Sequence, residues 1–135
     1  MVFASWGPDY SVGVAELDAQ HRNLFDLVKD FDDCIRRGLA RESIARDIDA
    51  LIQYSRYHFS YEEKLMKKYG YTEIAEQVAD HCEFVTAVTD FQDRWVAGGL
   101  VTAREVSTFM KEWLTGHILG SDMRYAECLR NCGVA

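Results

Sequence analysis

The stretch His58-Phe59-Ser60-Tyr61-Glu62-Glu63-Lys64-Leu65-Met66 decides how this chain folds. Residues 39–69 contain neither Gly nor Pro, and apolar side chains recur there at alternating steps of four and three, the spacing of a helix that packs on one side. The same stepping passes through His58 and Glu62, which places them one turn apart on the packed face. Two such groups need partners when buried, and a metal ion would serve both. A simple hydrogen bond on a solvated face is the alternative for this helix taken alone.

The same periodicity predicts three more helices around this one. The first begins at Leu17 and is ended by Gly38; the second runs from about Arg41 to Tyr69; Gly70 then caps it and Thr72 is expected to cap the third. A capping box over residues 102–105 opens the fourth. The stripes of the three other helices are Leu17, His21, Leu24, Val28, Phe31, Ile35; Ile74, Gln77, His81, Phe84, Val88, Phe91, Trp95; and Val106, Met110, Trp113, His117.

Residues 1–16 show no sustained period and contain Gly and Pro, which predicts an extended N-terminal arm. We expect Trp6 and Tyr10 to pack this arm against the body of the protein. Asp18 is expected to be an N-cap or a first-turn acid of the first helix. The length favours a single domain over residues 1–135, with the arm at 1–16 and the helical bundle at 17–131.

Long helices joined by short connections predict an all-α fold, an antiparallel up-down-up-down four-helix bundle. In that topology the start of the first helix, the end of the second, the start of the third and the end of the fourth share one end. All four histidines of the chain fall in those places, together with two acids and a Gln. The candidate metal ligands are therefore His21, His58, Glu62, Gln77, His81, His117 and Asp122.

Composition excludes several classes of protein. The formal net charge of −7 disfavours nucleic acid and anionic membrane surfaces as partners, and no apolar run is long enough to cross a bilayer. The first residues lack the pattern of a secretion signal, so a cytoplasmic location is expected. Four cysteines without a Cys-x-x-Cys pair are then expected to be free thiols, although Cys128 and Cys132 could form a redox pair. No feature identifies a protein partner.

The donor set consists of imidazoles and carboxylates without a thiolate. It disfavours a structural zinc site of the cysteine type and suits iron, manganese or zinc. Four histidines and two carboxylates are too many ligands for one ion. Because carboxylates can bridge, two ions that share Glu62 and Asp122 are the economical arrangement, and such sites are established inside four-helix bundles.

Motifs along nearly the whole chain resemble those of the hemerythrins, in particular the bacterial single-domain ones. The matching segments are Trp6, Gly13 with Leu17-Asp18-Ala19-Gln20-His21, His58-Phe59-x-x-Glu62-Glu63-x-x-Met66, Gly70-Tyr71, His81, and Trp113-Leu114-x-x-His117-Ile118 followed by Asp122. The resemblance implies a non-haem di-iron centre that binds dioxygen.

The resemblance also implies a role for each ligand. His21 and His58 would hold the iron that has a vacant position for dioxygen, and His81 and His117 would hold the other iron. Glu62 and Asp122 would bridge the two irons, with an oxo or hydroxo group as a third bridge (Fe–O–Fe or Fe–OH–Fe). Leu114 and Ile118, with Trp113 nearby, would line an apolar ligand pocket over the first iron.

Gln77 is the one clear departure from the family pattern, which has a histidine four residues before His81. An amide oxygen is a weaker donor than an imidazole. Gln77 either coordinates loosely, or hydrogen-bonds a water or other small ligand at an exchangeable position, or replaces the histidine with no functional change.

Three functions remain open at this level. An oxygen-binding protein for storage or delivery, and therefore not an enzyme, agrees best with the resemblance. A sensor of oxygen, redox state or nitric oxide would exploit an exchangeable position caused by Gln77. A di-iron peroxidase or oxidase ranks last, since no general base stands out. A stable oxygen adduct would favour the first function and rapid turnover of peroxide the third.

Overall fold

The computed structural model describes residues 6–38, 40–98 and 103–135, and the described residues contain helices and no strand. The all-α prediction is therefore confirmed. The elements in chain order are η1 (Pro8–Tyr10), α1 (Ala15–Arg36), α2 (Arg41–Lys68), α3 (Ile74–Val96), α4 (Ala103–His117), η2 (Ile118–Asp122) and α5 (Met123–Asn131).

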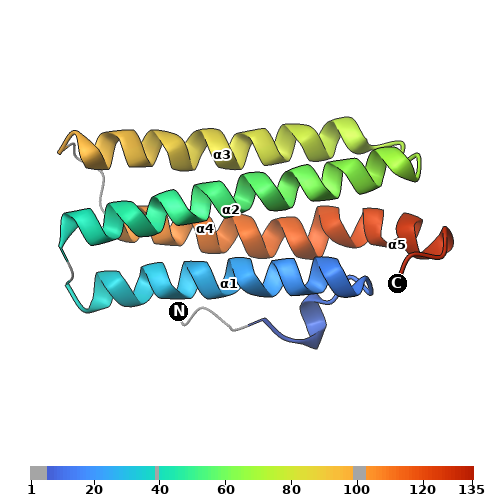
Figure 1. Ribbon diagram of the computed structural model, residues 1–135, viewed down its shortest axis with the longest axis horizontal. Coiled ribbons are helices and arrows are strands. Elements are labelled where there is room, and N and C mark those ends of the chain that lie inside the picture. Colours follow the sequence, from blue (N-terminus) through green and yellow to red (C-terminus); the bar gives the residue numbers. More distant parts are fainter. Residues whose placement is uncertain (1–5, 39, 99–102) are drawn as a thin grey trace.

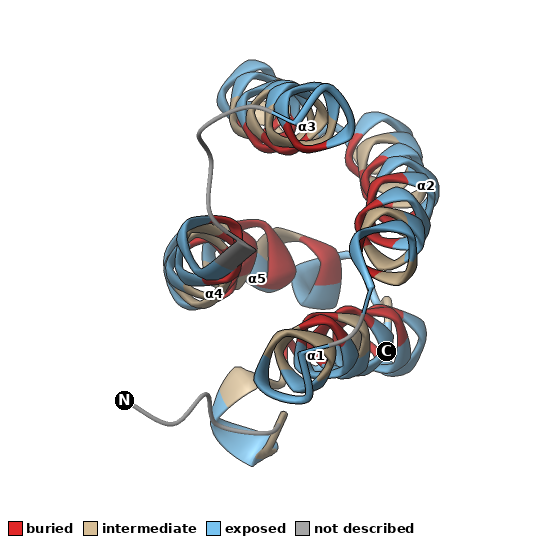
Figure 2. Cartoon of the chain, turned by 90° about the vertical axis from the view of Figure 1, so that its left-hand side faces the viewer, coloured by how far each residue is buried: buried red, intermediate tan, exposed pale blue. Residues whose placement is uncertain are grey.

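Four long helices form an antiparallel bundle in up-down-up-down order (Figure 1). Helix α1 packs against α2 and α4, and α3 packs against the same two helices, so the four axes lie at the corners of a square. Figure 2 shows this square along the bundle, with the buried faces of all four helices turned inward. The predicted topology is confirmed. The segments η2 and α5 continue the chain directly from the end of α4 at His117.

The apolar core is divided into two clusters along the bundle. The larger one fills most of its length and includes Leu24 and Phe59, while the smaller one closes one end and includes Leu17, Met66 and Tyr125. Along α1 the side chain of His21 follows Leu17 of the small cluster and precedes Leu24 of the large one. The predicted polar residues therefore lie between two buried apolar clusters. A charged group there destabilises the fold unless it has a partner.

The ends of α2 and α3 show one confirmed and one wrong prediction. Gly70, at φ +70°, ends α2 in a left-handed turn in which the Tyr71 amide donates to the Met66 carbonyl over 2.9 Å, as a C-capping glycine does. Thr72 does not cap α3. The turn carries the chain past Thr72, and helical bonds begin with the Glu73 carbonyl, which accepts from the amide of Glu76 over 3.2 Å. The predicted capping box at 102–105 begins outside the described residues.

The N-terminal arm is less extended than expected. Pro8 opens one turn of 3-10 helix, in which the Tyr10 amide donates to the Gly7 carbonyl over 3.0 Å, and α1 begins two residues earlier than predicted, at Ala15. The predicted packing is confirmed, because the Tyr10 ring lies 4.9 Å from that of Phe25 and Trp6 also packs on the large cluster.

Asp18 lies in the first turn of α1 and holds the arm in place. Its carboxylate accepts hydrogen bonds from the Ser11 hydroxyl over 2.6 Å and from the Val12 amide over 2.8 Å. We expect Asp18→Ala to lower the free energy of unfolding by about 2 kcal/mol, since hydrogen bonds to a charged group contribute about 1.5–3 kcal/mol. Urea titration measures the change, and a value within about 0.3 kcal/mol of wild type would contradict this role for Asp18.

No helix among the described residues has the length and apolar character needed to cross a membrane. The four cysteines are free in the described structure, as expected, with Cys82 and Cys132 exposed and Cys34 and Cys128 half-buried.

Candidate metal centre

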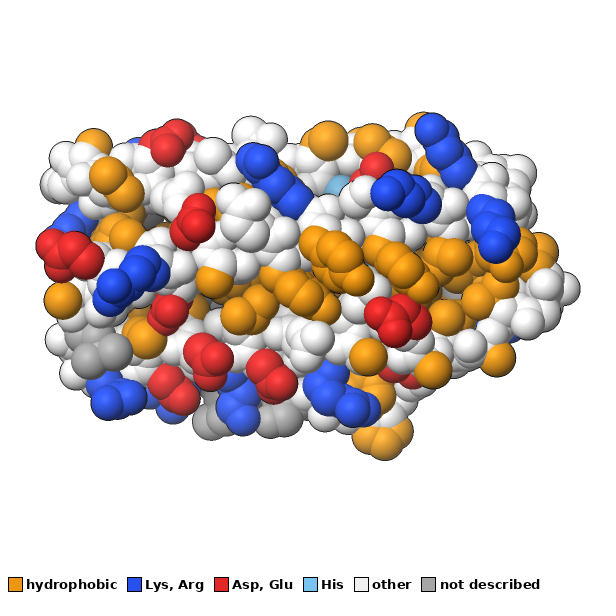
Figure 3. All heavy atoms as spheres, in the orientation of Figure 1, with side chains coloured by type: hydrophobic (Ala, Val, Ile, Leu, Met, Phe, Trp, Pro, Cys, Tyr) orange, Lys and Arg blue, Asp and Glu red, His pale blue; other side chains and the backbone are white. Residues whose placement is uncertain are grey.

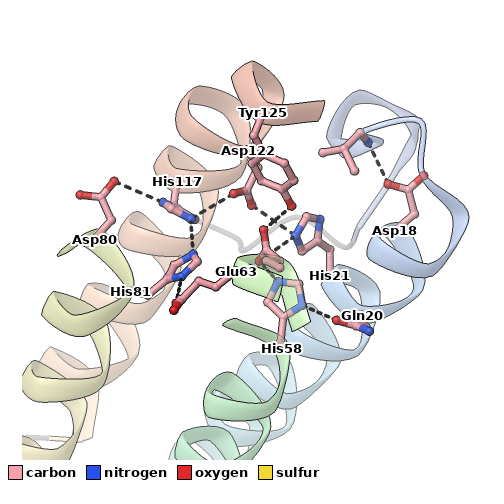
Figure 4. Close-up of polar contacts among 12 residues, drawn as sticks. Asp18, Gln20, His21, His58, Glu63, Asp80, His81, His117, Asp122 and Tyr125 are labelled. Atoms are coloured by element: carbon pink, nitrogen blue, oxygen red, sulfur yellow. Dashed lines mark hydrogen bonds and ion pairs between the residues drawn. The ribbon is translucent and has the colours of Figure 1, made fainter. Parts of the chain in front are cut away.

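The seven predicted ligands meet at one end of the bundle, where α1 and α3 begin and α2 and α4 end. None of them exposes more than 7% of its surface. Figure 4 shows the four histidines and Asp122 turned toward one another from these helices. Six of the seven form two buried groups whose ligand atoms lie close enough together to hold an ion: His21, His58 and Glu62, and His81, His117 and Asp122.

The first triad joins α1 to α2. His21 Nε2 lies 3.8 Å from Glu62 Oε1, and His58 Nε2 is in direct contact with the same oxygen. The other carboxylate oxygen of Glu62 accepts a hydrogen bond from the hydroxyl of Tyr125. Glu62 is thereby held from both sides with one oxygen directed to the two imidazoles.

The second triad joins α3 to α4. The Nε2 atoms of His81 and His117 lie 3.2 Å apart, and His117 Nε2 lies 3.1 Å from Asp122 Oδ1. His81 Nδ1 donates to Glu63 Oε2 over 2.8 Å, which assigns its proton to that side of the ring and leaves a lone pair on Nε2. The two Nε2 atoms are close enough either to share a hydrogen bond or to bind one cation together.

Asp122 connects the two triads. While its Oδ1 lies near His117, its Oδ2 lies 3.2 Å from His21 Nε2. A carboxylate with one oxygen in each triad has the arrangement of a bridging ligand. This is the feature that makes the two triads one site.

A π-helical turn places Asp122. His117 and Asp122 are five residues apart, which in an α-helix would separate their directions by about 140°. The segment η2 (Ile118–Asp122) is a π-helix, and its wider turn brings both side chains to the same side. Sequence reasoning located both residues at the correct end of the bundle but did not predict this turn.

The site has the properties of a cation site. Among the described residues His21 Nε2, Glu62 Oε1 and both oxygens of Asp122 are buried without a hydrogen-bond partner. The contacts of these four atoms are with one another and with the other histidines of the triads, so each carboxylate oxygen is satisfied only if a proton or a cation lies between it and an imidazole. Metal ions would satisfy all four atoms at once. Burial also lowers the pKa of His81 and so favours the neutral imidazole, the form that binds a metal.

A proton takes the place of a cation in the metal-free chain. Burial lowers the pKa of His21, but the adjoining carboxylates of Asp122 and Glu62 outweigh it and raise this pKa from 6.5 to about 10. Because the folded pKa lies above the ordinary value, this proton stabilises the metal-free fold fully below about pH 6.5, and the contribution is lost as the pH rises through about 10.

Metal uptake is therefore expected to release about one proton from His21 at pH 8, since a group with a pKa near 10 is almost fully protonated there. The apparent affinity should rise with pH up to about 10. Titration calorimetry with a divalent metal in two buffers of different ionisation enthalpy measures the release. Uptake without proton release at pH 8 would show that His21 is neutral in the metal-free site.

Three groups outside the triads hold the imidazoles, and sequence reasoning did not assign them this role. His58 Nδ1 donates to Gln20 Oε1 over 2.7 Å, His81 Nδ1 donates to Glu63, and His117 Nδ1 lies 3.6 Å from Asp80 Oδ2. Gln20 and Glu63 each adjoin a predicted ligand in the sequence, which is a signal that could have found them. Asp80 also adjoins a predicted ligand, His81, but the histidine that it approaches is His117 on the neighbouring helix, which adjacency in the sequence does not indicate.

Gln77 lies where the stripe predicted, one turn before His81. It is 2% exposed, and neither its amide oxygen nor its amide nitrogen has a hydrogen-bond partner among the described residues. Leu114 and Ile118 are buried in the large core cluster, and the Trp113 ring stacks on His117 with centroids 4.4 Å apart. Whether these three residues line a ligand pocket stays a prediction.

Fold and donor set together define a helical-bundle protein with a buried two-triad cation site. The Hemerythrin HHE cation binding domain family matches residues 12–129. The chain belongs to the hemerythrin family.

Individual relatives agree with this assignment. The bacteriohemerythrin of Methylococcus capsulatus is 33% identical over 130 residues, which cover 96% of this chain and 98% of the relative. A hemerythrin-like protein of Naegleria gruberi is 34% identical and covers 90% of this chain and 89% of its own length. A crystal structure of wild-type hemerythrin superimposes with a TM-score of 0.88 at 32% identity, covering 95% of this chain and 98% of that one.

Proposed function

We propose that this chain is a non-haem di-iron protein that binds dioxygen for storage or delivery. The observation that carries the proposal is the placement of Asp122, with one carboxylate oxygen in each of two buried histidine triads. Imidazoles and carboxylates suit iron. A bound pair of ferrous ions would supply the electrons for dioxygen binding. The family match is to a cation binding domain, which supports bound metal ions, and the resemblance to the hemerythrins implies that the metal is iron.

In this proposal the chain's own residues hold the ions and exclude water. His21, His58 and Glu62 hold one ion, His81 and His117 hold the other with Gln77 one turn away, and Asp122 spans both. The buried side chains of Leu114 and Ile118 provide apolar surroundings. Such surroundings favour binding of an uncharged diatomic molecule over acid–base chemistry, which supports a binding protein rather than an enzyme.

A second candidate function follows from Gln77. Its buried amide without a partner supports an exchangeable position at the ion held by His81 and His117. A centre that binds a second small ligand or oxidises readily would suit a sensor of oxygen, redox state or nitric oxide. The cytoplasmic location and the single-domain organisation over residues 1–135 stay predictions.

The test combines a metal count with an optical spectrum of the reduced protein before and after exposure to air. We expect two iron ions per chain, a new visible band on exposure to air, and reversal of that band under argon. A band that decays irreversibly within the dead time of mixing would favour the sensor. Rapid turnover of added peroxide would favour an enzyme.

A further inference from the structure

The groups that support the imidazoles differ in charge between the two triads. On the α3–α4 side both supports are carboxylates: Glu63 accepts from His81 Nδ1 over 2.8 Å, and Asp80 lies 3.6 Å from His117 Nδ1. Asp80 is itself held by the hydroxyl of Ser121, which donates to it over 3.2 Å. Each of these two histidines therefore has a carboxylate next to its Nδ1 atom, on the opposite side of the ring from Nε2.

The α1–α2 side has no such acid. His58 Nδ1 donates to the neutral amide of Gln20, and His21 Nδ1 has no hydrogen-bond partner in the described part of the chain. The two ions of the proposed pair would thus receive imidazoles of different donor strength. A carboxylate that accepts from the outer N–H makes an imidazole more basic at its metal-binding nitrogen, and an amide does so less.

The asymmetry coincides with the position of Gln77. This amide, the weakest candidate donor of the set, lies one turn before His81 on α3 and so lies on the side of the site that has the two carboxylate supports. We propose that Glu63 and Asp80 compensate for Gln77, because they strengthen His81 and His117 enough to retain an ion that lacks a third imidazole. The inference rests on the proposed metal pair, and Glu63 and Asp80 act in it as positioning residues.

The location of Glu63 makes the proposal testable without disturbing the core. Its side chain is 31% exposed and lines a surface groove of about 280 Å³ between α2 and α3. His81 and Cys82 line the same groove, and Figure 3 shows a histidine side chain and a neighbouring acid at the seam of these two helices. Glu63→Gln therefore removes a charge at a solvated edge and keeps the side-chain volume.

The experiment follows iron release from the loaded protein into excess of a ferrous chelator, with circular dichroism as a check of folding. Wild type is compared with Glu63→Gln and with the double variant Glu63→Gln/Gln77→His. The control is Glu83→Gln, which changes an exposed acid of α3. We expect Glu63→Gln to release one of its two ions about 10–100-fold faster and the other at the wild-type rate. Adding Gln77→His should restore slow release, and Glu83→Gln should match wild type.

Several outcomes would overturn the proposal. Release of both ions from Glu63→Gln at wild-type rates, equal acceleration of both, or failure of Gln77→His to restore retention would each contradict compensation. If Glu63→Gln did not fold, Asp80→Asn would take its place, because it acts on the other histidine of the same triad. A wild-type chain that takes up fewer than two ions would instead contradict the proposed function, and the two failures are thereby distinguished.

Discussion

Replacing Asp122 by alanine is expected to reduce the metal content from two ions per chain to nearly none. The carboxylate has one oxygen 3.1 Å from His117 Nε2 and the other 3.2 Å from His21 Nε2, so its removal takes a ligand from both triads at once. Loss of the charge would also leave Glu62 as the one carboxylate among the predicted ligands of two ions. Elemental analysis of iron-reconstituted protein measures the result.

Two controls make the Asp122 result specific. Asp122→Asn keeps the volume and one coordinating oxygen, and we expect it to retain metal better than the alanine variant while still binding more weakly than wild type. Glu127→Ala changes an exposed acid of α5 and should retain two ions. If the alanine variant kept two tightly bound ions, the carboxylate could not be the bridge between the triads.

Gln77→His is expected to slow autoxidation of the oxygen adduct about tenfold, equivalent to about 1.4 kcal/mol in the activation barrier. An amide oxygen competes poorly with water for a metal ion, whereas an imidazole does not. Gln77 is buried, and its amide lacks a hydrogen-bond partner in the described structure. A histidine at this position would replace that unsatisfied amide with an imidazole that can bind the ion. The decay of the visible band in air, followed side by side for both proteins, measures the difference.

Gln77→Leu serves as the comparison for this change, because leucine has a side chain of similar volume but supplies no atom that can bind a metal. It should oxidise at least as fast as wild type. Equal rates for wild type and Gln77→His would mean that the amide is a neutral exchange for an imidazole, and the sensor function would lose its main support.

The sequence was sufficient to predict which histidines and acids meet at one end of the bundle. Two features determine this: the helical period of the packed faces and the alternating direction of the helices. The steps of four and three place His58 and Glu62 on the packed face of α2, and the alternation of helix direction brings His21, His81 and His117 to the same end. Neither inference needs a side-chain conformation. The bundle and the convergence of these side chains therefore follow from patterning and topology, whereas their division between two ions was implied by the resemblance to the hemerythrins.

Other features depend on packing that no local pattern encodes. The five-residue spacing of His117 and Asp122 is compatible with a shared face only through the π-helical turn. Tyr125 reaches Glu62 from a residue 63 positions away in the sequence. Asp80 lies outside the stripe of α3, and its proximity to His117 depends on how α3 and α4 pack together.

Anomalous diffraction at the iron absorption edge, from crystals of the iron-loaded protein, tests the paired site most directly. We predict two peaks, one among His21, His58 and Glu62 and the other between His81 and His117, with Asp122 in contact with both. A single peak, or peaks outside the two triads, would contradict the assignment of a two-ion centre.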